Sequence, residues 1–460
     1  MPDSPRLLPL AIANQDQVPL ILNELRDHVT HAASFASVIR ESWSRFEAVP
    51  ASPFVLVLVA NSLEALQREI QVCQQTWSRC WQEGQEWKTP AGSLLAPQPA
   101  GPAGKLAFVY PGIGSLYPGY SRDLLTLFPD ALDNLPVPRD ALLAMLHREH
   151  LWPPSPEGES ATSEVSADWP LYRDIVAQAE ATVSLAYVWS HLLRNRFGIE
   201  PTMALGYSLG ELAMFSSCGC WQQPQELATR FRQWPSFRER LSNEMTLLKS
   251  TPQTSTIAAS EWANCLVQLT GAVPAIRQNA DEQIYITHLN TARELVVAGR
   301  ERDISGWMAR HNLRGQSLPS RLIYHCEPVR SEAETLQNLF ELPVAARPAI
   351  DFVSMPPYGR VPHDPRSIAR TLVNTAVRTV DWPEIVALAY QRGARCFLEI
   401  GPRNSCSSWI QSILTGKPHA TASTDRKGFD VATSLTRMFA QLLSHRVPLQ
   451  FSAVAHWVNS

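Results

Sequence analysis

A serine between two glycines is the feature of this sequence best suited to chemistry. Ser208 lies in residues 206–211, G-Y-S-L-G-E, which have the G-x-S-x-G form of a nucleophile elbow. The glycines permit a turn that lifts the serine hydroxyl clear of the backbone at a helix N-terminus, where amides can stabilise an oxyanion. We therefore predict acyl chemistry at Ser208. The alternative is a glycine-rich turn with an incidental serine.

A serine hydroxyl is a weak nucleophile until a base takes its proton, so the elbow requires a histidine. The chain has 12 histidines, and His325 stands out because the apolar residues 322–324 lead up to it and end there abruptly. This pattern is typical of a histidine at the edge of an element that faces a cleft. An ordinary packed histidine is the alternative.

The elements that must position these residues follow an α/β order. A buried-type strand at 105–110 runs into P-G-I-G-S at 111–115, a turn able to present backbone N–H groups. A helix over 171–197 leads to a strand at 203–205 and the elbow. A further helix is expected between Pro224 and Pro235.

Two other parts of the chain have sequence patterns that differ from those around Ser208 and His325. Residues 256–314 alternate short elements and predict an inserted β–α–β–β–α sandwich, after which main-domain sequence returns near Leu318. The first hundred residues predict a small α/β module, with helical spacing over 16–46 and a helix capped at Asn61-Ser62. A Pro- and Gly-rich linker over 96–104 follows it.

Composition excludes several classes of function. With 40 basic and 43 acidic residues the net charge is −3, which gives no electrostatic case for nucleic acid or an anionic membrane surface. No apolar stretch approaches the roughly 20 residues that span a bilayer, and the N-terminus does not resemble a secretory signal. The eight cysteines form no C-x-x-C pair, so we expect free thiols in a cytoplasmic protein and no metal site.

Five segments, in order over about residues 105–410, resemble the malonyl/acyl-CoA:acyl-carrier-protein transacylases. Residues 110–115 resemble the family's F-P-G-Q-G-S, 206–211 its G-H-S-x-G-E, Asn290 with 296–299 its N-x-P…V-V-S-G, 323–326 its A-F-H-S, and 397–402 its F-x-E-x-G-P. Tyr207, Trp221 and residues 381–382 and 399–402 make the chain most similar to the acyltransferase subunit of bacterial polyunsaturated fatty acid synthases.

The resemblance implies an α/β fold with an α/β-hydrolase-like main subdomain over 104–420. A ferredoxin-like subdomain would be inserted at about 245–317, which suits the 117 residues between Ser208 and His325. An α/β linker domain of the ketosynthase-to-acyltransferase type would occupy 1–100, and a wrap-around segment 421–460.

The resemblance also assigns site residues. Ser208 would take the acyl group from coenzyme A, and His325 would act as general base and then acid. The backbone N–H groups of Ile113 and Leu209 would form the oxyanion hole, although the family's glutamine at position 113 is isoleucine here. A main-chain carbonyl of Asn374 or Thr375 would orient the histidine.

One departure bears on the substrate. Malonyl-specific members carry an arginine in the helix after the elbow, and that position falls on Gln233, which we group with Tyr207 and Asn290 as substrate-binding. Arg232 is adjacent but would point in another direction. Three further arginines could take the place of the family's arginine only if the helix ends differently; these are Arg230, Arg238 and Arg240. Because a free carboxylate would then be poorly paired, a neutral acyl unit is favoured over malonyl. Glu211 is expected to be structural.

The predicted function is acyl transfer from coenzyme A to a phosphopantetheinylated acyl carrier protein, within polyunsaturated fatty acid or polyketide synthesis, with no bound cofactor. Carrier-protein domains and a ketosynthase are the expected partners. A linker domain with no ketosynthase before it suggests a fragment or a subunit that must find partners. The alternatives are a thioesterase or other serine hydrolase, and a non-catalytic docking module.

Overall fold

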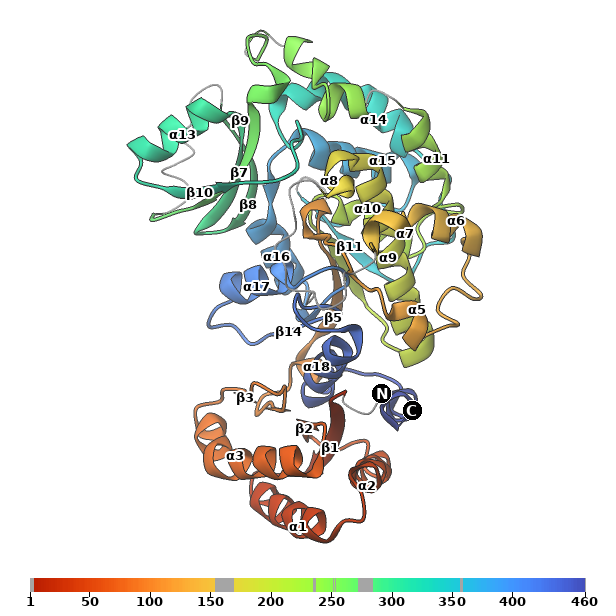
Figure 1. The fold of residues 1–460 in the computed structure, drawn as a ribbon, viewed down its shortest axis with the longest axis vertical. Helices are drawn as coiled ribbons and strands as arrows, with labels where there is room; N and C mark the ends of the chain where they lie inside the picture. Colours follow the sequence, from red (N-terminus) through yellow and green to blue (C-terminus); the bar gives the residue numbers. More distant parts are fainter. Residues whose placement is uncertain are drawn as a thin grey trace.

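The computed structural model describes residues 4–459, except 154–168, 235–236, 251, 253, 272–283 and 356–358. Figure 1 shows an N-terminal α/β unit at one end of the long axis, the main α/β unit above it, and a small sheet at the upper left. The fold class is α/β, as predicted.

A parallel sheet of five strands forms the centre of the main unit. Its strand order is β11-β6-β5-β13-β14. The strands are β5 (Lys105–Tyr110), β6 (Met203–Gly206), β11 (Asp351–Val353), β13 (Ala394–Glu399) and β14 (Ala420–Ser423). They are short and largely buried, as expected of a parallel sheet that is covered on both faces.

Alternate strand residues pack into two different cores. Phe108 and Ala204 belong to the core that includes helices α9 (Ile175–Phe197) and α10 (Gly210–Ser217). Val109 and Leu205 point to the other face, against α16 (Trp382–Gln391) and α17 (Ser405–Ile413). The remaining helices of this unit are α5 (Leu124–Leu127), α6 (Arg139–Met145), α7 (Arg148–Leu151), α8 (Pro170–Arg173), α11 (Glu226–Gln233), α14 (Ala333–Phe340) and α15 (Pro365–Val377).

The register of β5 and β6 decides where the site forms. The two strands are neighbours, and Tyr110 pairs with Gly206 at their carboxyl ends. In open parallel sheets ligands bind at this edge. The turn that contains Ile113 therefore lies beside the turn that contains Ser208.

The small sheet lies where the inserted subdomain was expected. It has the order β10-β7-β9-β8-β12 and comprises β7 (Trp262–Gln268), β8 (Ile284–Thr291), β9 (Glu294–Arg300), β10 (Arg314–Ser317) and β12 (Val380–Asp381), with helix α13 (Glu301–Arg310) beside it. The helix predicted between its first two strands falls on 272–283, outside the described residues. Strand β12 comes from the main unit and pairs in parallel with β8, which fastens the two units together.

The N-terminal unit is an antiparallel sheet, in the order β1-β2-β4-β3, with helices beside it. Its elements are β1 (Arg6–Ile12), α1 (Gln17–His31), α2 (Phe35–Glu47), β2 (Phe54–Ala60), α3 (Leu63–Gln82), β3 (Trp87–Lys88) and β4 (Leu94–Leu95). The helical spacing predicted over 16–46 corresponds to two helices, because Ser34 caps the second by accepting a hydrogen bond from the N–H of Ser37. Ser62 caps α3 as predicted.

The end of the chain packs back onto this unit. Helix α18 (Val431–Ser444) contacts both β2 and β14, and α19 (Phe451–Asn459) contacts α2 and α9. In Figure 1 both chain termini lie together at the junction. The linker is ordered, with a short helix α4 (Ala100–Ala103), and Gly101 N donates to the carbonyl of His445. Within the described ranges, no helix is long and apolar enough to cross a membrane.

Candidate active site

The turn at Ser208 has the geometry predicted for a nucleophile elbow. Ser208 adopts a left-handed φ of 59°, a conformation uncommon for a residue with a side chain. Its flanking glycines allow this turn: a Cβ on Gly206 would lie 2.2 Å from the nitrogen of Glu211, and one on Gly210 would lie 1.9 Å from the carbonyl oxygen of Tyr110. The turn therefore requires glycine at both positions.

The structure brings His325 to this serine. His325 Nε2 lies 2.6 Å from Ser208 Oγ, and its Nδ1 hydrogen-bonds the carbonyl oxygen of Thr375. Of the two residues that the sequence left open for this carbonyl, the structure selects Thr375 over Asn374. His325 is buried, and burial lowers its pKa to about 4, so the ring is neutral at pH 7. The Nδ1–H tautomer then leaves Nε2 free to accept the serine proton.

Glu211 supports the position of His325 through Thr375. It is fully buried and accepts hydrogen bonds from the hydroxyls of Ser354 and Thr375, the second at 2.5 Å. Glu211 therefore fixes Thr375, whose carbonyl orients His325. Burial raises the pKa of Glu211 to about 7. These contacts agree with the structural role expected for this residue.

We expect Glu211→Leu to destabilise the protein by about 2 kcal/mol or more, because a buried hydroxyl left without its partner costs about 1–3 kcal/mol. Urea unfolding at pH 7 would measure the loss. The matched control is Glu211→Gln, which keeps the size of the side chain and an acceptor. An unchanged unfolding midpoint for Glu211→Leu would contradict this role.

The two predicted oxyanion donors lie on neighbouring turns. Leu209 precedes α10, and Ile113 begins the short turn after β5. Neither N–H donates a hydrogen bond to another described residue, whereas the carbonyl of Ile113 accepts one from Gln178 Nε2 at 3.1 Å. Gln178, which the sequence analysis missed, is fully buried on α9 and fixes this turn. Its only sequence signal is a polar residue within an apolar helix.

Tyr207 and Asn290 meet across the boundary between the main and small units. Tyr207 Oη donates to Asn290 Oδ1 at 2.6 Å, and Asn290 Nδ2 donates to Glu294, which also accepts from Trp409. His288, also missed by the sequence analysis, lies with its ring centroid 4.6 Å from that of His325. Because Tyr207, Asn290 and Trp409 are linked through these hydrogen bonds, they form a fixed wall beside the serine.

Two cavities meet at Ser208. The outer cavity, about 1100 Å³ of empty space, is lined by Ile113, Tyr207, Ser208, Asn290, His325 and Arg403 among others. The inner cavity, about 540 Å³, is lined mainly by apolar and aromatic side chains, including Leu212, Phe231, Phe237 and Tyr324. Both include Ser208 in their lining, so a group bound to its oxygen could extend into either.

Gln233 is not brought to the site. It is exposed at the end of α11 and lines neither of the two cavities, whereas Phe231 on the same helix lines the inner one. Two residues along a helix differ in direction by about 200°, so the two side chains face opposite ways. Its predicted role in substrate binding gains no support from this position.

No family model matches this chain, but the comparisons with curated proteins and with solved structures agree with each other. The chain is 23% identical over 409 residues to a polyunsaturated fatty acid synthase subunit from Thraustochytrium, covering 85% of this chain and 20% of that protein. It is 22% identical to a non-reducing polyketide synthase of Gibberella zeae, covering 78% of this chain and 16% of that one. The chain thus spans about a fifth or less of these relatives.

Solved structures show the same fold. The acyltransferase domain from module 8 of the salinomycin polyketide synthase matches with a TM-score of 0.71 at 16% identity, covering 98% of both chains. A malonyl-CoA:acyl carrier protein transacylase from Helicobacter pylori matches with a TM-score of 0.54 at 17% identity, covering 73% of this chain and 98% of that one. The resemblance stated from the sequence, and the α/β fold it implied, are confirmed.

Proposed function

We propose that this chain transfers an acyl group from coenzyme A to the phosphopantetheine arm of an acyl carrier protein through an acyl-Ser208 intermediate. The observation that carries the proposal is the 2.6 Å contact between Ser208 Oγ and His325 Nε2, at the junction of two cavities. The likeness to synthase acyltransferase domains supports it.

The chemistry follows from the geometry. Ser208 Oγ attacks the thioester carbonyl while His325 Nε2 takes the hydroxyl proton. The N–H groups of Leu209 and Ile113 stabilise the oxyanion, and the coenzyme A sulfur leaves with the proton from His325. The carrier-protein thiol then enters through the outer cavity and gives its proton to His325. Its sulfur takes the acyl group from Ser208, and His325 passes the proton to the departing Ser208 Oγ.

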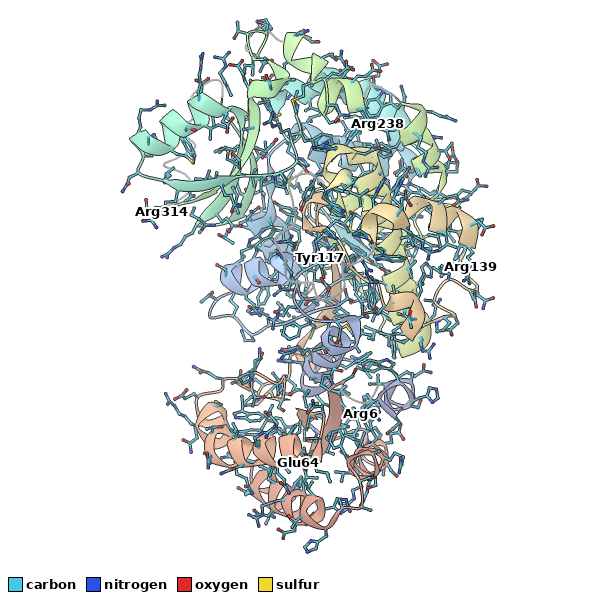
Figure 2. The ribbon with its side chains drawn as sticks, in the orientation of Figure 1. Arg6, Glu64, Tyr117, Arg139, Arg238 and Arg314 are labelled. Carbon is cyan, nitrogen blue, oxygen red and sulfur yellow. The ribbon has the colours of Figure 1, made fainter. Side chains whose placement is uncertain are left out.

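The arginines near α11 support a neutral acyl group. Arg232, the closest in sequence to the family position, donates to both carboxylate oxygens of Glu180 at 2.7 and 2.8 Å. The others are also paired: Arg230 with Glu226, Arg238 with Asp174 (Arg238 is labelled in Figure 2), and Arg240 with Glu332. Among the described residues that line the inner cavity, no side chain is charged. A malonyl carboxylate there would lack a partner.

Arg403 is the arginine of the outer cavity. Its Nε donates to the carbonyl of Ser115 at 3.1 Å, and its guanidinium lies over the ring of Tyr117, at the centre of Figure 2. Because it lies in the outer cavity and does not line the inner one, we place it with the coenzyme A or pantetheine portion of the substrate.

The orientation of His325 argues against a hydrolase. A main-chain carbonyl orients this histidine, whereas serine hydrolases of the α/β type use an acid. A non-catalytic docking module is also disfavoured, because Ser208 and His325 retain hydrogen-bonding geometry. We further propose a cytoplasmic setting, no bound cofactor, and partnership with carrier-protein and ketosynthase domains.

Intact-mass analysis with a panel of acyl-CoAs, followed by addition of a phosphopantetheinylated carrier protein, tests the proposal. We expect neutral acyl adducts that pass to the carrier protein, and a malonyl adduct at least about tenfold weaker, a difference of about 1.4 kcal/mol. Adducts lost to water at the same rate with or without carrier protein would favour the hydrolase. No adduct with any acyl-CoA would favour the docking module, and a strong malonyl adduct would refute the neutral-acyl assignment.

A further inference from the structure

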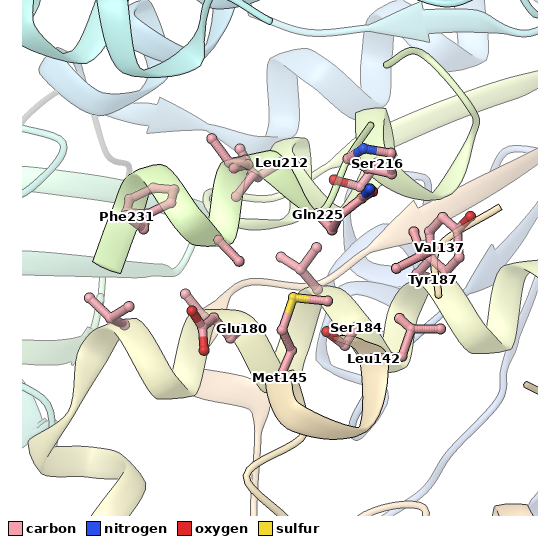
Figure 3. A pocket seen from close by; sticks show the side chains of 16 residues that line it. Val137, Leu142, Met145, Glu180, Ser184, Tyr187, Leu212, Ser216, Gln225 and Phe231 are labelled. Carbon is pink, nitrogen blue, oxygen red and sulfur yellow. The ribbon is translucent and has the colours of Figure 1, made fainter. Parts of the chain in front are cut away.

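A third cavity adjoins the inner one, away from the catalytic pair. This distal cavity lies between α6, α9, α10 and α11 and holds about 510 Å³ of empty space, part of which is open to solvent. Figure 3 shows its lining. Ala179, Leu212 and Phe231 line both the inner and the distal cavity, and we call these three residues the neck.

The path beyond the neck is suited to hydrocarbon. Helix α9 presents one face to it, at the i, i+3, i+4 spacing of residues 176, 179, 180, 183, 184 and 187. Leu142 and Met145 of α6 close another side (Figure 3), and Leu227 of α11 also lines the cavity. Glu180 is the charged residue of this lining, and its carboxylate is held by Arg232 and His147, so its charge is compensated.

Three of the residues that line the distal cavity carry a polar atom without a partner in the described part of the chain. Ser184 Oγ, Ser216 Oγ and Gln225 Oε1 are buried and have no hydrogen-bond partner among the described residues. Figure 3 shows Ser216 and Gln225 side by side on the α10–α11 wall. Pressing hydrocarbon against such groups costs about 1–3 kcal/mol each, so they would limit how far an apolar tail extends.

We propose that the acyl tail runs from Ser208 through the inner cavity and the neck into the distal cavity, so that the substrate is an unbranched acyl group of medium or long chain. This inference rests on the proposed function and specifies its substrate. From Ala179 to Tyr187 the lined face of α9 rises about 12 Å, and each C–C bond of about 1.5 Å advances an extended chain by little more than 1 Å. The lined face past the neck is therefore about as long as roughly eight extended tail carbons.

The test compares acetyl-CoA with C8 to C16 acyl-CoAs by intact mass, for the wild type and three leucine variants. Ala179→Leu fills the neck and is expected to reduce long-chain adducts at least about tenfold relative to acetyl, about 1.4 kcal/mol. Ser184→Leu fills the distal cavity and should lower only the longest length accepted. Asn195→Leu, on an exposed position of the same helix, is the matched control and should leave the chain-length profile unchanged.

The outcomes separate this inference from the proposed function. If the wild type forms short-chain adducts and no long-chain ones, the inference fails and the acyl-transfer proposal stands. If long-chain adducts form equally on the wild type and on folded Ala179→Leu, the tail takes another route and the inference fails. Absence of every adduct overturns both. Thermal unfolding of each variant identifies any loss of fold, and Val183→Leu would then replace a variant that does not fold.

Discussion

Replacement of Ser208 by alanine is expected to abolish the acyl-enzyme and to reduce transfer to the carrier protein by about 10⁴–10⁶-fold, the scale measured when a serine nucleophile is removed. The physical reason is the loss of the nucleophile, because among the described residues only the Ser208 hydroxyl lies 2.6 Å from His325 Nε2. The measurement is intact mass for the adduct and single-turnover transfer for the rate.

The Ser208→Ala variant is also a clean structural probe. Alanine keeps the Cβ that Ser208 already places in the left-handed turn, and the hydrogen bond of the serine side chain goes to His325. We therefore expect an unchanged thermal unfolding midpoint. An adduct of the same mass and amount on a folded Ser208→Ala variant would mean that another nucleophile carries the acyl group.

Much of this site could be predicted because it depends on local sequence. The glycines at 206 and 210 fix the elbow, and apolar strands at 105–110 and 203–205 bring the two turns to one sheet edge. His325 could be selected from 12 histidines because an apolar run ends at it and the family motif surrounds it. Their contact, across 117 residues, requires the fold.

What could not be predicted depends on side-chain direction and on long-range packing. Gln233, the position aligned with the family's arginine, is exposed because α11 directs Phe231 inward. The sequence does not define which residues of a short helix face inward to within one residue. Gln178 and Glu211 act through main-chain and hydroxyl partners that are distant in sequence. The neck and the distal cavity arise where four helices meet, which no local pattern indicates.

The second large effect is expected on removal of His325, the proposed general base. We expect His325→Ala to reduce acyl transfer by about 10⁴-fold or more, because the serine proton then has no acceptor among the described residues within hydrogen-bonding distance. The comparison variant is His288→Asn, which removes the neighbouring half-buried imidazole, with its ring centroid 4.6 Å away, and should cost far less. Equal losses in the two variants would move the role of base away from His325.

The pH dependence gives an independent test of the same assignment. Burial lowers the pKa of His325 to about 4, from an ordinary value of 6.5, so the base is already neutral across physiological pH. In the wild type, kcat/KM should therefore be level near pH 7 and decline only as pH falls towards about 4. Since the unfolded chain binds this proton first, the contribution of His325 to the free energy of unfolding should decrease as pH falls from about 6.5 to about 4. Circular dichroism at each pH separates unfolding from loss of activity, and a half-maximal rate near pH 6.5 in folded protein would show that the base is solvated rather than buried.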